Sequence, residues 1–238
     1  MGEIGKEKSL WLLSAFCFAA MTAAVPFSKM ELPLRAGTFL QYYKTALSSR
    51  GILFLIPIIS VLPAGASYVK ETSNGFLKLY IIRISRMDYI KRKILLVYAG
   101  GFLPFFVAGV LSFLFHFLLF YPLELKGVIE KEGVLEVLFL LSCICLVGGI
   151  MAEISGVFAA VFRNYYMAYG LPFVCYYLLI ILKDRYLPDL YAMYPGEWIV
   201  PQQDWGTNGM GIWMFFFVFS VGVCLLHGLL LYHRLKEI

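Results

Sequence analysis

The chain has 238 residues, of which 61% are hydrophobic and only 15% are charged. A soluble domain of this length cannot bury so large an apolar share, so the composition excludes an ordinary soluble protein and indicates an integral membrane protein. The formal net charge is +5, and residues 68–93 carry all of it, because this segment holds seven of the 20 basic residues and two of the 15 acidic ones.

Six segments are long and apolar enough to cross a membrane, because a span needs roughly 20 mostly apolar residues. These predicted spans are 9–27, 51–68, 94–120, 134–162, 165–182 and 211–232. No linker, repeat or low-complexity tract divides the chain, so we predict one all-α polytopic membrane domain over residues 1–238. Because the number of spans is even, both termini are expected on the same side of the membrane.

The first span has an alternative interpretation as a signal peptide. Lys6 and Lys8 precede an apolar run that ends near the small residues Ala23 and Ala24. The run is longer than the roughly 7–15 residues of a signal peptide's apolar region, and no clean small-x-small cleavage site follows it. We therefore favour a membrane span.

The orientation follows from the basic residues, which concentrate in cytoplasmic loops. With the N-terminus inside, 12 Lys and Arg residues lie in the cytoplasm and eight lie outside. The seven in 68–93 form one cluster, whereas the eight outside are dispersed and accompanied by acidic residues. We therefore predict a multi-pass protein of the cell membrane with both termini in the cytoplasm.

The basic segment contains a short helix that is apolar on nearly every side. After Ser73 or Asn74, which can cap a helix, the run 76–84 is interrupted by only two basic residues. Such a helix must be buried on more than one side, and we expect the membrane surface to cover one side and a partner protein the other. The alternative is an amphipathic loop held by anionic lipid. Ser85 and Asp88 then have the spacing of a capping box that starts a helix leading into the third span.

Two connections between the later spans are informative. Arg163 and Asn164 alone join the fourth and fifth spans, which must therefore be antiparallel neighbours. The outer segment 186–198 is rich in Tyr, Trp and Pro, which favour the headgroup level and break helices, so we expect short interfacial or re-entrant pieces before the sixth span. All five cysteines fall inside predicted spans, and they indicate neither disulfides nor a metal site.

Glu153 is the one acidic residue deep within a predicted span, roughly 15 Å from the inner surface at 1.5 Å per residue. His227 lies at a comparable depth on the sixth span and is a potential partner, whereas His116 lies nearer the outer side. Two interpretations stay open for Glu153. It is either a protonated group that is hydrogen-bonded inside the bundle, or part of a gate or a proton-coupling device.

Two patterns in the chain resemble type-2 ABC-transporter permeases. The first lies between the second and third spans and consists of Glu71, Asn74-Gly75, Lys78-Leu79, Ser85-Arg86, Tyr89 and Lys93. The second lies at the turn from the fourth to the fifth span and consists of Ile154-Ser155, residues 163–166, Ala168 and residues 171–173. Six spans with both termini inside also agree with the short bacterial members of that family.

The resemblance implies the transmembrane half of an ATP-driven exporter, in which the helix within 68–93 is a coupling helix that docks on a separate ABC ATPase subunit. The docking residues that it implies are Glu71, Gly75, Phe76, Lys78, Leu79, Ile82, Arg83, Ser85, Arg86 and Tyr89. ATP and Mg²⁺ would be bound by that partner, because this chain has no G-x-x-x-x-G-K-[ST] motif, and we expect no cofactor on the chain itself. A second permease half, either another copy or a related chain, would complete the transporter.

The resemblance also implies a transport path lined largely by the second and fifth spans. Our candidates for the path or its gate are Pro57, Ser60, Tyr169, Tyr176, Glu153 and His227. A path that is partly apolar and partly hydroxyl-bearing suits an amphipathic, peptide or lipid-like cargo. The alternative for the Pro, Ser and Tyr residues is ordinary helix packing and interfacial anchoring.

Two other functions stay open. An intramembrane protease or lipid hydrolase would use Glu153, His116 and His227, but its chemistry needs groups that converge at one depth, and the chain has neither His-x-x-x-His nor Gly-x-Ser-x-Gly. A non-transporting immunity or sensor protein is the second alternative. We do not expect binding to nucleic acid, because membrane topology and docking account for the basic segment.

Overall fold

The computed structural model describes residues 8–26, 34–125, 131–206 and 209–237, with the backbone but not the side chains of Phe76, Lys78, Leu79 and Tyr80. These residues are largely helical and contain no β-strand, which confirms the predicted all-α class. The long helices are α6 (Arg86–Phe120), α7 (Lys131–Phe162), α8 (Tyr165–Arg185) and α10 (Met210–Lys236). The shorter elements are α1 (Lys8–Ala23), α2 (Thr38–Leu47), α3 (Arg50–Ile59), α4 (Ser67–Ser73), α5 (Phe76–Arg83), η3 (Tyr121–Leu123), η4 (Tyr191–Met193) and α9 (Pro195–Ile199).

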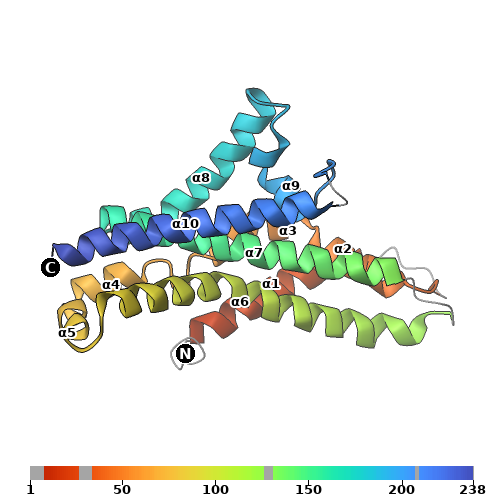
Figure 1. The fold of residues 1–238 in the computed structure, drawn as a ribbon. Helices are drawn as coiled ribbons and strands as arrows, with labels where there is room; N and C mark the ends of the chain where they lie inside the picture. Colours follow the sequence, from red (N-terminus) through yellow and green to blue (C-terminus); the bar gives the residue numbers. More distant parts are fainter. Residues whose placement is uncertain (1–7, 27–33, 126–130, 207–208, 238) are drawn as a thin grey trace.

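The molecule is an elongated bundle with two distinct ends (Figure 1). Helices α6, α7 and α10 lie lengthwise beside one another, and α8 leans away from them. Helices α4 and α5 lie at one end, together with the start of α6 and the final turns of α10. We call this end the α5 end. The end of α6 and the start of α7 lie at the opposite end of the bundle.

Helix α7 is the centre of the bundle, because it contacts α6, α8 and α10 as well as the shorter α2, α3, α4 and α9. Its closest approach to α6 depends on two glycines. A Cβ atom on Gly101 would lie 2.4 Å from the carbonyl oxygen of Gly148, and one on Gly148 would lie 2.7 Å from the carbonyl oxygen of Gly101. Small residues that let helix backbones meet in this way are the usual means of packing helices in a membrane.

Among the described residues, four helices are long and apolar enough to span a membrane by length and composition. They are α6 with η3 (Arg86–Leu123), α7, α8 and α10, and they contain the last four predicted spans. Helix α1 covers the first predicted span with 16 residues, or about 24 Å at 1.5 Å per residue, which is less than the roughly 30 Å of a bilayer core. Six complete spans are therefore more than the described helices establish.

The second predicted span is not one helix, which corrects the prediction for 51–68. The structure divides it into α3 and α4, joined by a turn at 60–66. Pro63 has no N–H to donate to the preceding turn, and its ring disfavours a continuing α-helix. Ser60, Val61 and Ala64 in the turn are buried against the bundle, whereas Leu62 between them is 42% exposed.

Helix α2 lies in a segment that the sequence analysis assigned to an outer connection. Its first turn is capped from a distant part of the chain, because the carboxylate of Glu124 accepts hydrogen bonds from the backbone N–H groups of Gly37 at 2.9 Å and Phe39 at 2.5 Å. A negative group at this position satisfies the free N–H groups and complements the helix dipole. Glu124 thereby fixes α2 to the end of α6.

The segment before α10 contains the short pieces that its Tyr, Trp and Pro content predicts, namely η4 and α9. The indole N–H of Trp198 donates to the carbonyl oxygen of Ala192 at 2.7 Å, and its ring contacts Phe215 and Phe219 of α10. Buried Glu197 accepts hydrogen bonds from the backbone N–H groups that follow α9. These contacts hold the segment on the bundle.

Candidate functional site

Helix α5 lies at the α5 end, and a specific turn separates it from the helix on each side. Gly75 adopts a left-handed backbone conformation with φ of 68°, which separates α5 from α4. At the other end of α5, the hydroxyl of Ser85 accepts a hydrogen bond from the backbone N–H of Asp88 at 3.2 Å and caps α6. The Asp88 carboxylate reaches back to the Ser85 hydroxyl at 2.6 Å rather than to its backbone N–H. The predicted cap therefore forms, although its second half differs from a standard capping box.

One side of α5 is anchored in the chain itself. Leu77 is 1% exposed and packs in a cluster with Tyr68, Tyr89, Ile90, Ala160, Leu231 and Leu235. The side of α5 that carries Leu77 is therefore covered by α4, α6, α7 and α10 of the chain itself, a cover that the sequence did not predict. The opposite side of α5 is open, since Ile82 is 82% exposed.

The ten residues that the family resemblance assigns to docking fall into three groups. Gly75, Ile82, Arg83, Ser85 and Arg86 are exposed at the α5 end. Glu71 is half-buried and Tyr89 is buried, so these two are internal rather than available to a partner. The side chains of Phe76, Lys78 and Leu79 lie outside the described part of the chain.

The internal group forms a polar cluster between α4 and α6. The ammonium group of Lys93 lies 2.7 Å from the carboxylate of Glu71, and the hydroxyl of Tyr89 donates to the other oxygen of that carboxylate at 2.6 Å. Lys93 also donates to the hydroxyl of Ser67 at 3.2 Å. The Lys93 side chain is only 4% exposed, and a buried ammonium group requires partners of this kind. The cluster therefore holds α4, which precedes α5 in the chain, against α6, which follows it.

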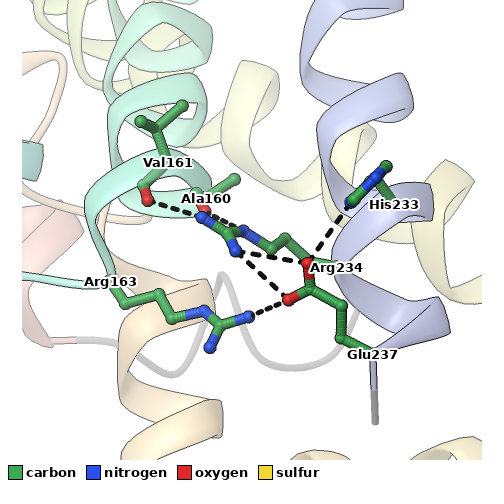
Figure 2. A network of polar contacts seen from close by, with 6 residues as sticks. All are labelled: Ala160, Val161, Arg163, His233, Arg234 and Glu237. Atoms are coloured by element: carbon green, nitrogen blue, oxygen red, sulfur yellow. Dashed lines mark hydrogen bonds and ion pairs between the residues drawn. The ribbon is translucent and has the colours of Figure 1, made fainter.

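A second polar network at the α5 end joins the last turns of α7 and α10 (Figure 2). The guanidinium group of Arg234 donates to the carbonyl oxygens of Ala160 at 3.1 Å and Val161 at 2.8 Å, which the end of α7 leaves without helical partners. The Glu237 carboxylate lies 2.7 Å from Arg163 and 3.1 Å from Arg234. The hydrogen bond from Arg234, followed by its charge and by Arg163, lowers the pKa of Glu237 below its ordinary value.

The same network marks the turn between α7 and α8. Arg163 has a φ of 52°, an uncommon value for a residue other than glycine, and ends α7. The side chain of Asn164 then caps α8 by accepting from the backbone N–H of Tyr166 at 2.8 Å. The two-residue turn predicted between these spans is therefore present, and Glu237 of the C-terminal segment is bound to it.

Glu153 and His227 form a buried polar contact between α7 and α10. The Nδ1 atom of His227 lies 2.6 Å from Oε2 of Glu153, and the two side chains are no more than 1% exposed. Gly156 makes room for the imidazole ring, because a Cβ atom at that position would lie 2.4 Å from Cε1 of His227. The second oxygen of Glu153 and Nε2 of His227 have no hydrogen-bond partner among the described residues. The two residues that the sequence placed at one depth are thus in contact.

His116 lies in different surroundings, near the far end of α6. Its Nδ1 atom is 2.6 Å from the carbonyl oxygen of Ser112, and its ring contacts Tyr43 and Phe120. Within the described ranges, no three His, Cys, Asp or Glu side chains gather as metal ligands would.

The other candidate path residues are divided between the core and the surface. Pro57, Ser60 and Tyr176 are buried. Helices α3 and α8, which correspond to the second and fifth predicted spans, do contact each other, and Phe54 meets Phe173 and Tyr177 there. Of the six candidates, Glu153 and His227 contact each other, and Tyr169 lines an open pocket at the α5 end.

No protein-family model matches the chain, and no curated protein matches its sequence.

Proposed function

We propose that the chain is the membrane-spanning permease subunit of an ATP-driven exporter of the type-2 ABC class, with α5 as the helix that docks on a separate ATPase subunit. The observation that carries the proposal is the mounting of α5. One side is anchored through Leu77, the flanking helices are clamped by Lys93 and Glu71, and the other side presents exposed Ile82 beside the exposed basic residues Arg83 and Arg86.

This arrangement suits a helix that passes the movement of a docked subunit to the rest of the bundle. A helix that is held firmly on two flanking helices moves with them, and α6 continues from its clamp at Lys93 through the whole bundle. An exposed isoleucine is unfavourable in water. Its burial under a partner is favourable by roughly 25 cal/mol per Å² of apolar surface removed from water. A subunit that closes on ATP binding can thereby displace α6.

The remaining parts of the proposal concern topology and partners. In it, α1 and the broken pair α3–α4 serve as the first two of six spans, and the basic segment 68–93 keeps the α5 end and both termini in the cytoplasm. ATP and Mg²⁺ belong to the ATPase subunit, and a second permease half completes the path. The contact of α3 with α8 supports a path between these helices, with an amphipathic, peptide or lipid-like cargo.

Purification of the tagged chain from its own cells tests the docking role. We expect the wild type to retain a subunit that contains G-x-x-x-x-G-K-[ST] and hydrolyses ATP, and Ile82→Asp to lose it. Tyr166→Asp is the matched control, because Tyr166 is 86% exposed on α8 and Ile82 is 82% exposed on α5. Equal ATPase recovery with Ile82→Asp and with wild type, or no ATPase with the wild type, would contradict the proposal.

A further inference from the structure

An open pocket of about 370 Å³ lies at the α5 end between α1, the turn after α3, α4 and α8. Its polar lining includes Lys8, Ser67, Lys70 and Tyr165, and part of its wall is apolar, including Leu62 and Pro63. The turn between α3 and α4 supplies this wall, and Pro63 lies within it. The pocket is thus built from segments that are far apart in the sequence.

The pocket carries two positive charges, and no countercharge faces them among the residues that the structure describes. Within those residues no Asp or Glu lines the pocket, and neither Lys8 nor Lys70 forms an ion pair. Other lysines of the chain do have partners, since Lys44 pairs with Glu136 and Lys93 pairs with Glu71. Two ammonium groups that face one hollow repel each other, and an anion between them would relieve that repulsion.

Hydroxyl groups add directional donors to the same hollow. The oxygen of Ser67 accepts a hydrogen bond from Lys93, so its own O–H remains a donor. Tyr165 also lines the pocket, and its hydroxyl lies 3.4 Å from that of Ser73. Ammonium and hydroxyl donors that converge on one hollow match the several acceptor oxygens of a phosphate group, and hydrogen bonds to an ionised partner are the stronger kind.

The pocket lies at the start of a helix that is long and apolar enough to span a membrane. Tyr165 begins α8, which is long and apolar enough to span a membrane, so the pocket lies where an apolar helix gives way to polar chain. Leu62, 42% exposed, lines the apolar wall beside the charged groups. A phospholipid headgroup offers both a phosphate for the lysines and an adjoining apolar chain for this wall.

We propose that this pocket binds a phosphate-bearing anion through Lys8 and Lys70. The two sources of such an anion are the headgroup of an anionic phospholipid and free inorganic phosphate. The site does not depend on ATPase docking, because none of the docking residues whose side chains the structure describes lines it.

The test measures the thermal unfolding midpoint of the purified chain in detergent at constant ionic strength. Dioleoylphosphatidylglycerol, dioleoylphosphatidylcholine and inorganic phosphate are titrated separately. We expect the anionic lipid to raise the midpoint of the wild type in a saturable way, and the zwitterionic lipid to do so much less. Lys8→Gln/Lys70→Gln should raise the apparent Kd for the anionic lipid by about tenfold or more, since each lysine supplies a charge-assisted contact.

Two control variants separate this site from general attraction between charges. Lys91→Gln/Arg92→Gln removes the same two positive charges from exposed positions on α6 outside the pocket and should keep the wild-type Kd. Lys8→Arg/Lys70→Arg keeps both charges and should restore binding if the glutamine pair has lost it. A midpoint without lipid that equals that of the wild type shows that a variant has folded.

The outcomes are distinct. An effect of inorganic phosphate that equals the effect of the lipid would assign the site to a soluble phosphate, whereas an effect of the lipid alone assigns it to a headgroup. An unchanged Kd in Lys8→Gln/Lys70→Gln, or an equal loss in Lys91→Gln/Arg92→Gln, would overturn the proposal.

Discussion

Lys93 and Glu71 form an ion pair of 2.7 Å across the hairpin that carries α5, although one side chain is 4% exposed and the other 31%. The ammonium group is therefore almost enclosed, while the carboxylate keeps contact with the surroundings. Tyr89 completes the contact by donating to the same carboxylate. Because α4 and α6 meet through this pair, the position of α5 depends on a polar contact rather than on apolar packing alone.

Removal of the carboxylate should destabilise the protein more than the same change at an exposed pair. We expect Glu71→Gln to lower the free energy of unfolding by about 1–3 kcal/mol, because it leaves a buried donor poorly satisfied. The matched control is Glu136→Gln, whose partner Lys44 is 45% exposed, and it should cost less than about 1 kcal/mol. Denaturant unfolding in detergent measures both. Equal effects of the two substitutions would show that the Lys93 contact contributes no more than a surface ion pair.

Replacement of Gly156, which lies next to the imidazole ring of His227, should destabilise the protein. A Cβ atom there would lie 2.4 Å from Cε1, and a ring packed between α7 and α10 cannot move aside freely, so Gly156→Ala should cost about 1–3 kcal/mol. Gly170→Ala on α8 is the matched control, because nothing lies within 4 Å of its added Cβ atom. That control should be neutral or stabilise by up to about 1 kcal/mol. A neutral Gly156→Ala would argue against the close contact of His227.

Glu153 itself should tolerate replacement by its amide. Glu153→Gln keeps the shape and a hydrogen bond to Nδ1 of His227, so we expect a loss of less than about 1 kcal/mol and retained assembly. Glu153→Leu leaves Nδ1 unpaired and should cost about 1–3 kcal/mol more. If Glu153→Gln assembles normally but abolishes transport, the carboxylate carries a proton or gates the path rather than only packing.

The long helices were predictable because each is a continuous apolar run. The predicted span 134–162 lies within α7 (Lys131–Phe162), and the predicted span 211–232 lies within α10 (Met210–Lys236). The second span was harder, since its apolar composition continues through Pro63 and proline alone does not mark a break: Pro104 and Pro172 lie inside the continuous helices α6 and α8. Composition identifies a span, but it does not report whether the backbone stays helical.

Helix α2 was not predicted, although its residue pattern indicates an amphipathic helix. Its buried residues Phe39, Leu40, Tyr43, Ala46 and Leu47 recur at helical spacing, and they predict an amphipathic helix. The cap supplied by Glu124 had no such signal, because the two partners are more than 80 positions apart in the chain.

The candidate site was predictable in part. A comparison of helix depths was enough to suggest the pairing of Glu153 with His227. The same method did not assign Glu71 and Tyr89 to an internal clamp, because sequence spacing does not show which side of a hairpin faces its own bundle. The role of Arg234 also depends on a contact between distant helices, namely its hydrogen bonds to the end of α7.

The Glu237 network should weaken in acid. A lowered pKa means that folding favours the ionised carboxylate, so its contribution is complete above the ordinary pKa of about 4.3 and is lost as the pH falls through the lowered value. Glu237→Gln should therefore have a lower unfolding midpoint than the wild type at pH 7. The difference should persist near the ordinary pKa and disappear only as the pH falls through the lowered pKa, where the protonated carboxyl is neutral like the amide. Thermal unfolding from pH 7 to pH 3 measures it, and a difference that is constant with pH would exclude the ionised carboxylate as the cause.

The last prediction concerns the orientation of the α5 end. In a cysteine-free version of the chain, single cysteines at Arg83 and Asp189 should respond oppositely to an impermeant thiol reagent on whole cells. Both positions are exposed, Arg83 at the end of α5 and Asp189 just before η4. Because seven basic residues in 68–93 resist translocation, the cysteine at 83 should be protected and the one at 189 labelled. Permeabilised cells provide the control, since both should then react. Labelling of position 83 on intact cells would place α5 outside the cytoplasm, where no ATP-driven partner reaches it, and the permease proposal would fail.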